Sequence, residues 1–221
     1  MKMIVAGATG LVGGHIIQYG SSREMISQVV CVGRNAPHFE SRKIEFLKAD
    51  FDEPLILEGE IKRKHNQIDL GFCALGTTIK TAGNRANFRK VDFDYVVHFA
   101  RACKNMGVTR FGVVSSTGAD LSSWAFYLRI KGEMEEALKA IGFEHLIIAR
   151  PSLLLGQRGE FRLGEVIIQT LHPVTKWLYR GPFAGIQPVS ASDVAIKLFE
   201  RTLRSPSHLE YLSDFTDPTH T

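Results

Sequence analysis

The sequence predicts an α/β fold in which a parallel sheet is covered by helices on both faces. Two observations lead to this prediction. Short apolar runs alternate with stretches of helical length through the first part of the chain, which is the pattern of strands joined by crossover helices. The 221 residues, 44% of them hydrophobic, are enough for one well-packed domain but not for two full ones. We therefore expect a doubly wound parallel sheet.

The expected elements follow one another in a regular order. Residues 3–6 form a short apolar run that ends at Gly7, and residues 11–19 carry apolar side chains at helical spacing. Further strands are predicted at residues 29–32, 44–47, 68–74, 111–114 and 145–149, and helices at 91–106 and 123–141. The basic run at residues 62–65 is typical of a solvated helix end.

The character of the chain changes after Arg150 and Pro151. Glycines and prolines punctuate residues 151–188, which indicates shorter elements and crossover loops. Within a single domain of residues 1–221, we expect residues 1–150 to form the core and residues 151–221 to form a small lobe beside the substrate. A last helix is predicted from Ser192 or Asp193 to about Leu203, with Ser192 as N-cap; beyond it the end is expected to be ragged and partly mobile.

The composition and the spacing of particular residues argue against several classes of function. The 27 basic and 23 acidic residues give a formal charge of +4, which is too small to indicate a nucleic-acid partner. The three cysteines lie far apart without a C-x-x-C pair, which fits buried reduced thiols. We see no signal-peptide pattern and no run near ~18 apolar residues, so we expect a cytoplasmic protein without a membrane span. No histidine spacing suits zinc, and no G-x-S-x-G suits a hydrolase.

A glycine-rich turn between the first strand and the first helix predicts a dinucleotide site. Its glycines permit a tight turn, close approach of backbone to a pyrophosphate, and close packing of helix on strand. The N-terminus of the following helix offers unpaired N–H groups and a positive dipole to an anion. The residues expected to bind here are Gly7, Thr9, Gly10, Leu11, Val12 and Gly13.

The second strand indicates which dinucleotide binds. It ends without the acidic residue that would hold a ribose 2′-OH, whereas Arg34 can form a bidentate pair with a 2′-phosphate. NADP(H) is therefore favoured over NAD(H). Asp50 and Phe51, after the third strand, are expected to flank the adenine. The residues expected beside the ribose and pyrophosphate follow the fourth strand: Ala74, Leu75, Gly76 and Thr77.

Tyr127 and Lys131 are four residues apart, so on a helix they lie on one face. A phenol with a pKa near ~10 needs a nearby cation to exchange protons at neutral pH, and Lys131 supplies one. The lysine could also bond the ribose of the nicotinamide. Ser116 or Ser115, after the fifth strand, would hydrogen-bond a substrate carbonyl oxygen. The pattern predicts an acid/base site.

With these motifs in order, the chain resembles the short-chain dehydrogenase/reductase superfamily over essentially its whole length. The segments that resemble its atypical branch, which includes the Tat-interacting oxidoreductase, are residues 7–13, 73–78, 91–96, 115–120, 127–133 and Arg150-Pro151. The resemblance implies a Rossmann fold, NADPH at the glycine turn and Arg34, and Arg150 and Pro151 beside the cofactor. It also implies Tyr127 as proton donor and acceptor, aided by Lys131 and a serine. Many members have a relay asparagine where this chain has Asp92.

We therefore expect an NADPH-dependent oxidoreductase that reduces a small carbonyl or enone-like substrate. Apolar residues near the crossover loop favour a hydrophobic substrate: Trp124, Phe126, residues 153–155, Phe161, Trp177 and Phe183. Two alternatives stay open. One is an NADP(H)-binding redox-sensing or assembly protein with little turnover, and the other is a relative of the epimerases and dehydratases. The expected partner is a small-molecule substrate, with a homodimer left open.

Overall fold

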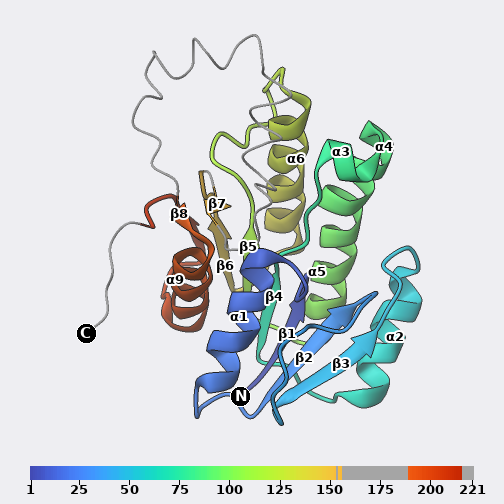
Figure 1. Cartoon of the computed structure of the whole chain (residues 1–221), viewed down its shortest axis with the longest axis vertical. Helices are drawn as coiled ribbons and strands as arrows, with labels where there is room; N and C mark the ends of the chain where they lie inside the picture. The colour runs from blue at the N-terminus through green and yellow to red at the C-terminus, as the bar shows by residue number, and fades with distance from the viewer. Residues whose placement is uncertain (153, 156–188, 216–221) are drawn as a thin grey trace.

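Seven parallel strands form the centre of the molecule, which is a computed structural model of the chain (Figure 1). The structure describes residues 1–152, 154–155 and 189–215. The strands lie in the order β3-β2-β1-β4-β5-β6-β9. Their bounds are β1 Lys2–Ala6, β2 Gln28–Gly33, β3 Ile44–Lys48, β4 Leu70–Cys73, β5 Arg110–Val114, β6 His145–Ala149 and β9 Leu209–Leu212. The predicted doubly wound parallel sheet is confirmed.

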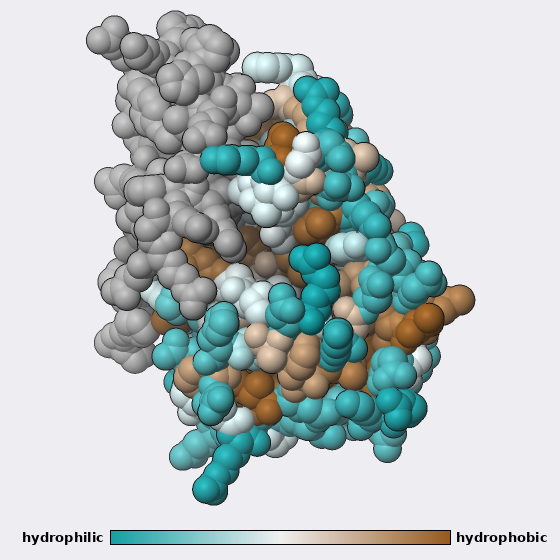
Figure 2. Space-filling model, turned by 45° about the vertical axis from the view of Figure 1, so that its right-hand side comes forward, coloured by the Kyte–Doolittle hydropathy of each residue, from teal (hydrophilic) through white to brown (hydrophobic). Residues whose placement is uncertain are grey.

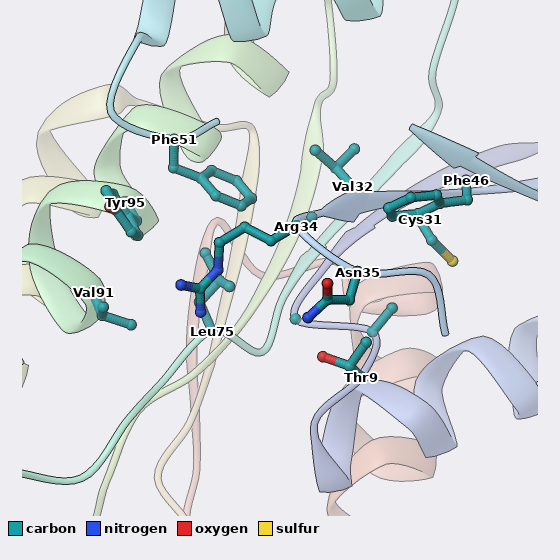
Figure 3. Close-up of a pocket in the computed structure, with 13 residues that line it drawn as sticks. Thr9, Cys31, Val32, Arg34, Asn35, Phe46, Phe51, Leu75, Val91 and Tyr95 are labelled. Atoms are coloured by element: carbon teal, nitrogen blue, oxygen red, sulfur yellow. The ribbon is translucent and has the colours of Figure 1, made fainter. Parts of the chain in front are cut away.

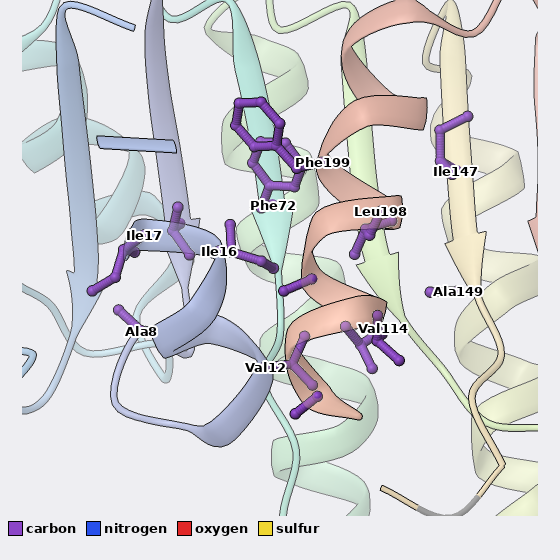
Figure 4. Packing of buried hydrophobic residues seen from close by; sticks show 14 of the residues in the cluster. Ala8, Val12, Ile16, Ile17, Phe72, Val114, Ile147, Ala149, Leu198 and Phe199 are labelled. Carbon is purple, nitrogen blue, oxygen red and sulfur yellow. The ribbon is translucent and has the colours of Figure 1, made fainter. Parts of the chain in front are cut away.

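Helices cover both faces of this sheet (Figure 1). One face is covered by α1 (Leu11–Ser22) and α9 (Ala191–Arg204), and the other by α2 (Pro54–Lys64), α5 (Tyr95–Asn105) and α6 (Phe126–Ile141). The core under α1 and α9 includes the rings of Phe72 and Phe199, stacked with centroids 5.5 Å apart (Figure 4). On the opposite side, Phe111 and Phe143 stack at 4.6 Å. In Figure 2, hydrophilic side chains cover much of the described part of the visible face, with hydrophobic side chains among them.

The first strand shows why the sequence contains short apolar runs rather than alternating ones. Met3 and Val5 belong to the core under α1 and α9, and Ile4 and Ala6 belong to the opposite core. All four are fully buried. Because successive side chains of a strand point to opposite faces, a strand covered on both sides must be apolar at every position.

The helical segment before β5 starts earlier than predicted and is not uniform. It follows the short helix α3 (Ile79–Ala82) and consists of α4 (Arg85–Arg89), a π-helical turn η1 (Lys90–Asp94) and α5. Asn84 begins it, since its side chain accepts a hydrogen bond of 2.8 Å from the Asn87 amide. A π-helical turn inserts an extra residue, and such turns are frequent at functional sites.

Two predictions about the end of the chain are wrong. The last helix is capped by Ser190 rather than Ser192, because the Ser190 hydroxyl accepts a hydrogen bond from the Ser192 amide. The expected ragged end contains β9, which pairs in parallel with β6 and buries Leu212. Four residues are too few to show a period, so the pairing partner defines this strand. Most of the predicted substrate-side lobe, including residues 216–221, lies outside the described residues. In the part of this lobe that the structure describes, β7 (Leu154–Leu155) pairs with β8 (Val189–Ser190).

The cysteines are buried and free, as predicted: Cys31, Cys73 and Cys103. Among the described residues, no helix combines the length and apolarity needed to cross a bilayer. The same part of the chain holds no group of three or more His, Cys, Asp or Glu side chains arranged to bind a metal ion.

Candidate functional site

The strand order reverses between β1 and β4, and their carboxyl ends define the site. From β1 the sheet continues through β2 to β3, and from β4 through β5 to β6 and β9. Open α/β sheets bind ligands in the crevice at such a reversal. The loops that leave the two strands touch there, because a Cβ built on Gly7 would lie 2.5 Å from the carbonyl carbon of Ala74.

The glycine turn has the shape of a cradle for an anion. Gly7 has a φ of +85°, which favours glycine, and a Cβ on Gly13 would lie 2.1 Å from the Gly7 carbonyl oxygen. Helix α1 follows, and its N-cap Gly10 has no capping side chain. The first turn of α1 contains no acidic residue, so the positive end of the helix dipole can interact with a negatively charged ligand. The turn fits the pyrophosphate of a dinucleotide.

A pocket opens beside this turn (Figure 3). It is lined by Gly7, Ala8, Thr9, Cys31, Val32, Gly33, Arg34, Asn35, Phe46, Phe51, Leu75, Val91 and Tyr95. Arg34 is the one charged residue among these lining residues, and Figure 3 shows its guanidinium reaching toward the side of the pocket that Val91 and Leu75 line. The pocket offers a positive charge and aromatic walls, which suits a phosphorylated nucleotide.

The lining agrees only in part with the residues predicted from sequence. Gly7, Thr9, Arg34, Phe51 and Leu75 line the pocket. The other predicted residues of the nearby turns do not line it: Gly10, Leu11, Val12, Gly13, Asp50, Ala74, Gly76 and Thr77. The Asp50 carboxylate instead accepts a hydrogen bond of 2.9 Å from the Asp52 amide.

Sequence reasoning missed four large or polar lining residues: Asn35, Phe46, Val91 and Tyr95. A signal for two of them was available. Val91 and Tyr95 are four residues apart in a helical segment, so they share a face that borders the site.

Tyr127, Lys131 and Ser116 come together in the structure. Tyr127 and Lys131 occupy successive turns of α6 and are both buried. Ser116 lies just after β5; its hydroxyl donates a hydrogen bond of 3.2 Å to the Thr117 carbonyl and is close enough to Tyr127 to act on the pKa of the phenol. The Tyr127 ring packs against Phe88 with centroids 5.7 Å apart, which fixes the position of the phenol.

Lys131 is also paired with an acidic residue. Its Nζ lies 2.7 Å from Oδ1 of Asp92, which is in the π-helical turn η1. The other carboxylate oxygen of Asp92 accepts a hydrogen bond of 2.8 Å from the Thr77 amide. The side chains of Lys131 and Asp92 are only 4% and 1% exposed. Asp92 therefore bonds the lysine directly.

Burial dominates the electrostatics of this group. It raises the pKa of Tyr127, against the opposing effects of Lys131 and Ser116, and Asp92 adds to the rise. For Lys131, burial acts to lower the pKa, but Asp92 and Tyr127 outweigh it and the pKa is raised. Burial also raises the pKa of Asp92, against the effects of Lys131 and the Thr77 amide. Tyr127 is consequently a protonated phenol at neutral pH.

Ser115 and Arg150 belong to a second cluster, around Glu135. The Ser115 hydroxyl donates a hydrogen bond to the Glu135 carboxylate, and Arg150 Nε donates another at 3.0 Å. Glu135 is 1% exposed. The Pro151 carbonyl accepts a hydrogen bond of 3.0 Å from the Thr117 amide, which ties down the loop after β5. Glu135 escaped the sequence reasoning although it lies four residues beyond Lys131, on the same helix face.

We expect Arg150→Ala to destabilise the fold by about 3 kcal/mol, because it leaves the buried Glu135 carboxylate without its ionic partner. Urea unfolding would measure the loss. The matched control is Arg89→Ala, which breaks a half-exposed ion pair with Glu133 on the same helix and should cost less than about 1 kcal/mol. Equal losses in the two variants would contradict the structural role of Arg150.

Comparison with known proteins agrees with this site. The model of a family described as NAD(P)H-binding matches residues 7–172. Protein FMP52, mitochondrial, of Candida albicans is 34% identical over 197 residues, which cover 88% of this chain and 84% of that protein. Protein HTATIP2 of Rattus norvegicus is 33% identical over 203 residues, which cover 88% of this chain and 75% of that protein.

Solved structures share the fold. A UDP-glucose 4-epimerase of Thermotoga maritima has a TM-score of 0.71 at 15% identity, covering 97% of this chain and 76% of that one. A short chain dehydrogenase family protein of Francisella tularensis has a TM-score of 0.69 at 13% identity, covering 96% of both chains. Fold and pocket thus define a Rossmann-type, NAD(P)-binding protein. The chain belongs to the NAD(P)H-binding family, in the atypical short-chain dehydrogenase/reductase branch that includes HTATIP2.

The expectation of a cytoplasmic protein is wrong. Relatives from Candida albicans, Meyerozyma guilliermondii and Emericella nidulans are all named as mitochondrial proteins. The expectation rested on reduced thiols and on the lack of a secretory signal pattern. Neither observation separates the cytosol from the mitochondrion, because import into mitochondria uses a different kind of signal.

Proposed function

We propose that the protein is an NADPH-dependent oxidoreductase that reduces a small, hydrophobic carbonyl or enone-like substrate. One observation carries this proposal: a buried phenol, Tyr127, lies close to the buried Ser116 hydroxyl and to the paired Lys131, and both act on its pKa. The site and the cofactor cradle are joined by one loop. Its Ala74 backbone meets Gly7, and its Thr77 amide bonds Asp92.

The arrangement suits proton donation to a carbonyl oxygen. A bound nicotinamide would supply the hydride. Ser116 would hold the carbonyl oxygen by a hydrogen bond, and the Tyr127 hydroxyl would protonate that oxygen as negative charge develops on it. The raised pKa of Tyr127 supports the role of donor, because the phenol carries its proton at neutral pH.

Apolar side chains near Tyr127 support a hydrophobic substrate. Trp124, three residues before Tyr127, is 78% exposed, and Leu121 is 51% exposed. Large exposed apolar side chains that form a contiguous patch favour an apolar ligand, and both residues lie in the segment that leads into α6. Phe126 instead packs on Phe88. The remaining aromatic residues of this prediction lie outside the described residues: Phe161, Trp177 and Phe183.

The Arg34 side chain supports NADPH over NADH. We expect Arg34→Ala to weaken NADPH binding by about 10- to 100-fold, the value of one or two charge-assisted hydrogen bonds, and to change NADH binding little. Fluorescence titration with both nucleotides would measure this. Arg42→Ala is the control, since Arg42 lies outside the lining of the pocket. Equal weakening of both nucleotides by Arg34→Ala would contradict a contact with the 2′-phosphate.

The proposed activity is tested by titration of the purified protein with NADPH and NADH, followed by a panel of aldehydes, ketones and quinones monitored for loss of NADPH. Turnover of any of these carbonyl compounds would support the reductase. Tight NADPH binding without turnover would favour a redox-sensing protein instead. Failure to bind either nucleotide would overturn both proposals.

A further inference from the structure

Two acidic groups compete for the single positive charge of Lys131. The ammonium could stabilise a phenolate at Tyr127, one helical turn away, but it already lies 2.7 Å from the carboxylate of Asp92. Two unit charges at such a distance, with little access to water, cancel much of each other's field at a third group. Asp92 thus opposes the effect of Lys131 on Tyr127, and the charge that reaches the phenol is smaller than that of an unpaired lysine.

Asp92 is held in place by the loop that follows β4, residues 74–77, as well as by Lys131. The Thr77 amide donates a hydrogen bond to Oδ2 of Asp92, and a Cβ built on Gly76 would lie 3.5 Å from Oδ1 of the same side chain. The π-helical turn that carries Asp92 also contributes Val91 to the pocket. The Asp92 carboxylate is therefore part of the site and is not an isolated charge in the hydrophobic core.

We propose that Asp92 is a positioning residue that fixes Lys131 and, by pairing with its charge, keeps Tyr127 in the phenol form that donates a proton. The inference rests on the proposed oxidoreductase function and assigns that site a preferred direction, the reduction of a carbonyl. Asp92 would thus stand where many related proteins have a neutral relay asparagine, and its carboxylate would restrain Lys131.

Among the residues that the structure describes, few other titratable groups act on this pair. Tyr127 faces it from α6, and Cys73 faces it from β4. Burial raises the pKa of the Cys73 thiol to about 12, so this thiol stays neutral over the range in which enzymes are assayed. Cys103, on which Cys73 acts, also has its pKa raised by burial. Of the described groups around this pair, Tyr127, Lys131 and Asp92 are thus those whose protonation can change.

The test is an ultraviolet titration of tyrosinate in Asp92→Asn, with the matching Tyr127→Phe variant subtracted so that only Tyr127 contributes. We expect Tyr127 to ionise about one to three pH units lower than in the unaltered protein, because the ammonium loses its partner. Asp94→Asn makes the same charge change within the same turn and should leave the titration where it is. An unchanged Tyr127 titration in a folded Asp92→Asn protein would overturn the proposal.

A double variant covers the case in which Asp92→Asn fails to fold. Removing both charges of a buried pair is often tolerated, so Asp92→Asn combined with Lys131→Met should fold. If Asp92 cancels the charge of Lys131, Tyr127 in this double variant should titrate close to its position in the unaltered protein. A marked upward shift of the Tyr127 titration would show that Asp92 does not cancel the charge of Lys131, and it would overturn the proposal. Neither titration needs turnover, so failure of the reductase proposal would be seen separately, in the substrate panel.

Discussion

Replacement of Tyr127 with phenylalanine is expected to lower carbonyl reduction by about 10²- to 10⁴-fold, which is the usual contribution of a positioned general acid. The change removes one hydroxyl and keeps the ring, which packs on Phe88. The fold should therefore survive. NADPH affinity should be nearly unchanged, because Tyr127 does not line the pocket beside the glycine turn. Steady-state rates and a fluorescence titration would measure the two quantities on the same preparation.

The control for this change is Tyr19→Phe, which also removes a single tyrosine hydroxyl. Tyr19 is on α1 and bonds Glu200 on α9, so it belongs to another surface of the molecule. Its loss should leave the rate of reduction as it is. A Tyr127→Phe protein that reduces substrate at the unaltered rate would remove this residue from the mechanism.

The second large effect is expected at Gly13. In Gly13→Ala the new methyl group would lie 2.1 Å from the Gly7 carbonyl oxygen, a distance that no relaxed structure allows. Helix α1 must then move away from the turn that cradles the pyrophosphate. We expect NADPH binding to weaken by about 100-fold or more, which corresponds to the loss of about two charge-assisted hydrogen bonds to the pyrophosphate. Titration of the variant with NADPH measures it.

Gly14 provides a matched control one residue along the same helix. A Cβ on Gly14 would lie 3.7 Å from the Ala8 carbonyl oxygen, which is ordinary van der Waals contact. Gly14→Ala should therefore bind NADPH much as the unaltered protein does, and alanine is the better helix former. If both variants bound NADPH equally well, the close packing of α1 on the glycine turn would not be what shapes the cofactor site.

Local patterns were enough to predict the sheet and the cofactor turn. A strand covered on both faces is apolar at each position, so β1, β2 and β6 are visible as short apolar runs. Gly13 is required by its contact with the Gly7 backbone, which is near it in the chain, whereas Gly7 is required both by its own φ of +85° and by the distant Ala74 backbone. In contrast, β9 exists because β6 offers it an edge, and no local signal records that pairing.

The roles of neighbouring residues in the site could not be separated by sequence alone. Ser115 and Ser116 are both hydroxyl residues after the same strand, yet Ser115 bonds Glu135 whereas Ser116 lies by Tyr127 and acts on its pKa. Adjacent side chains of an extended segment point to opposite sides, and the sequence does not show which side holds the tyrosine. The π-helical turn is also invisible to a search for helical periodicity, although it carries Asp92.

The loop after β4 has a consequence for redesign of this protein. One short stretch, residues 74–77, supports the glycine turn at one end and the buried carboxylate at the other. Substitutions there should alter nucleotide affinity and turnover together, so neither trait can be selected alone through this loop. Arg34 directly follows β2, which is separated from β4 by β1 in the sheet. An engineer who wishes to exchange one nucleotide for the other should therefore work at β2 and leave the β4 loop untouched.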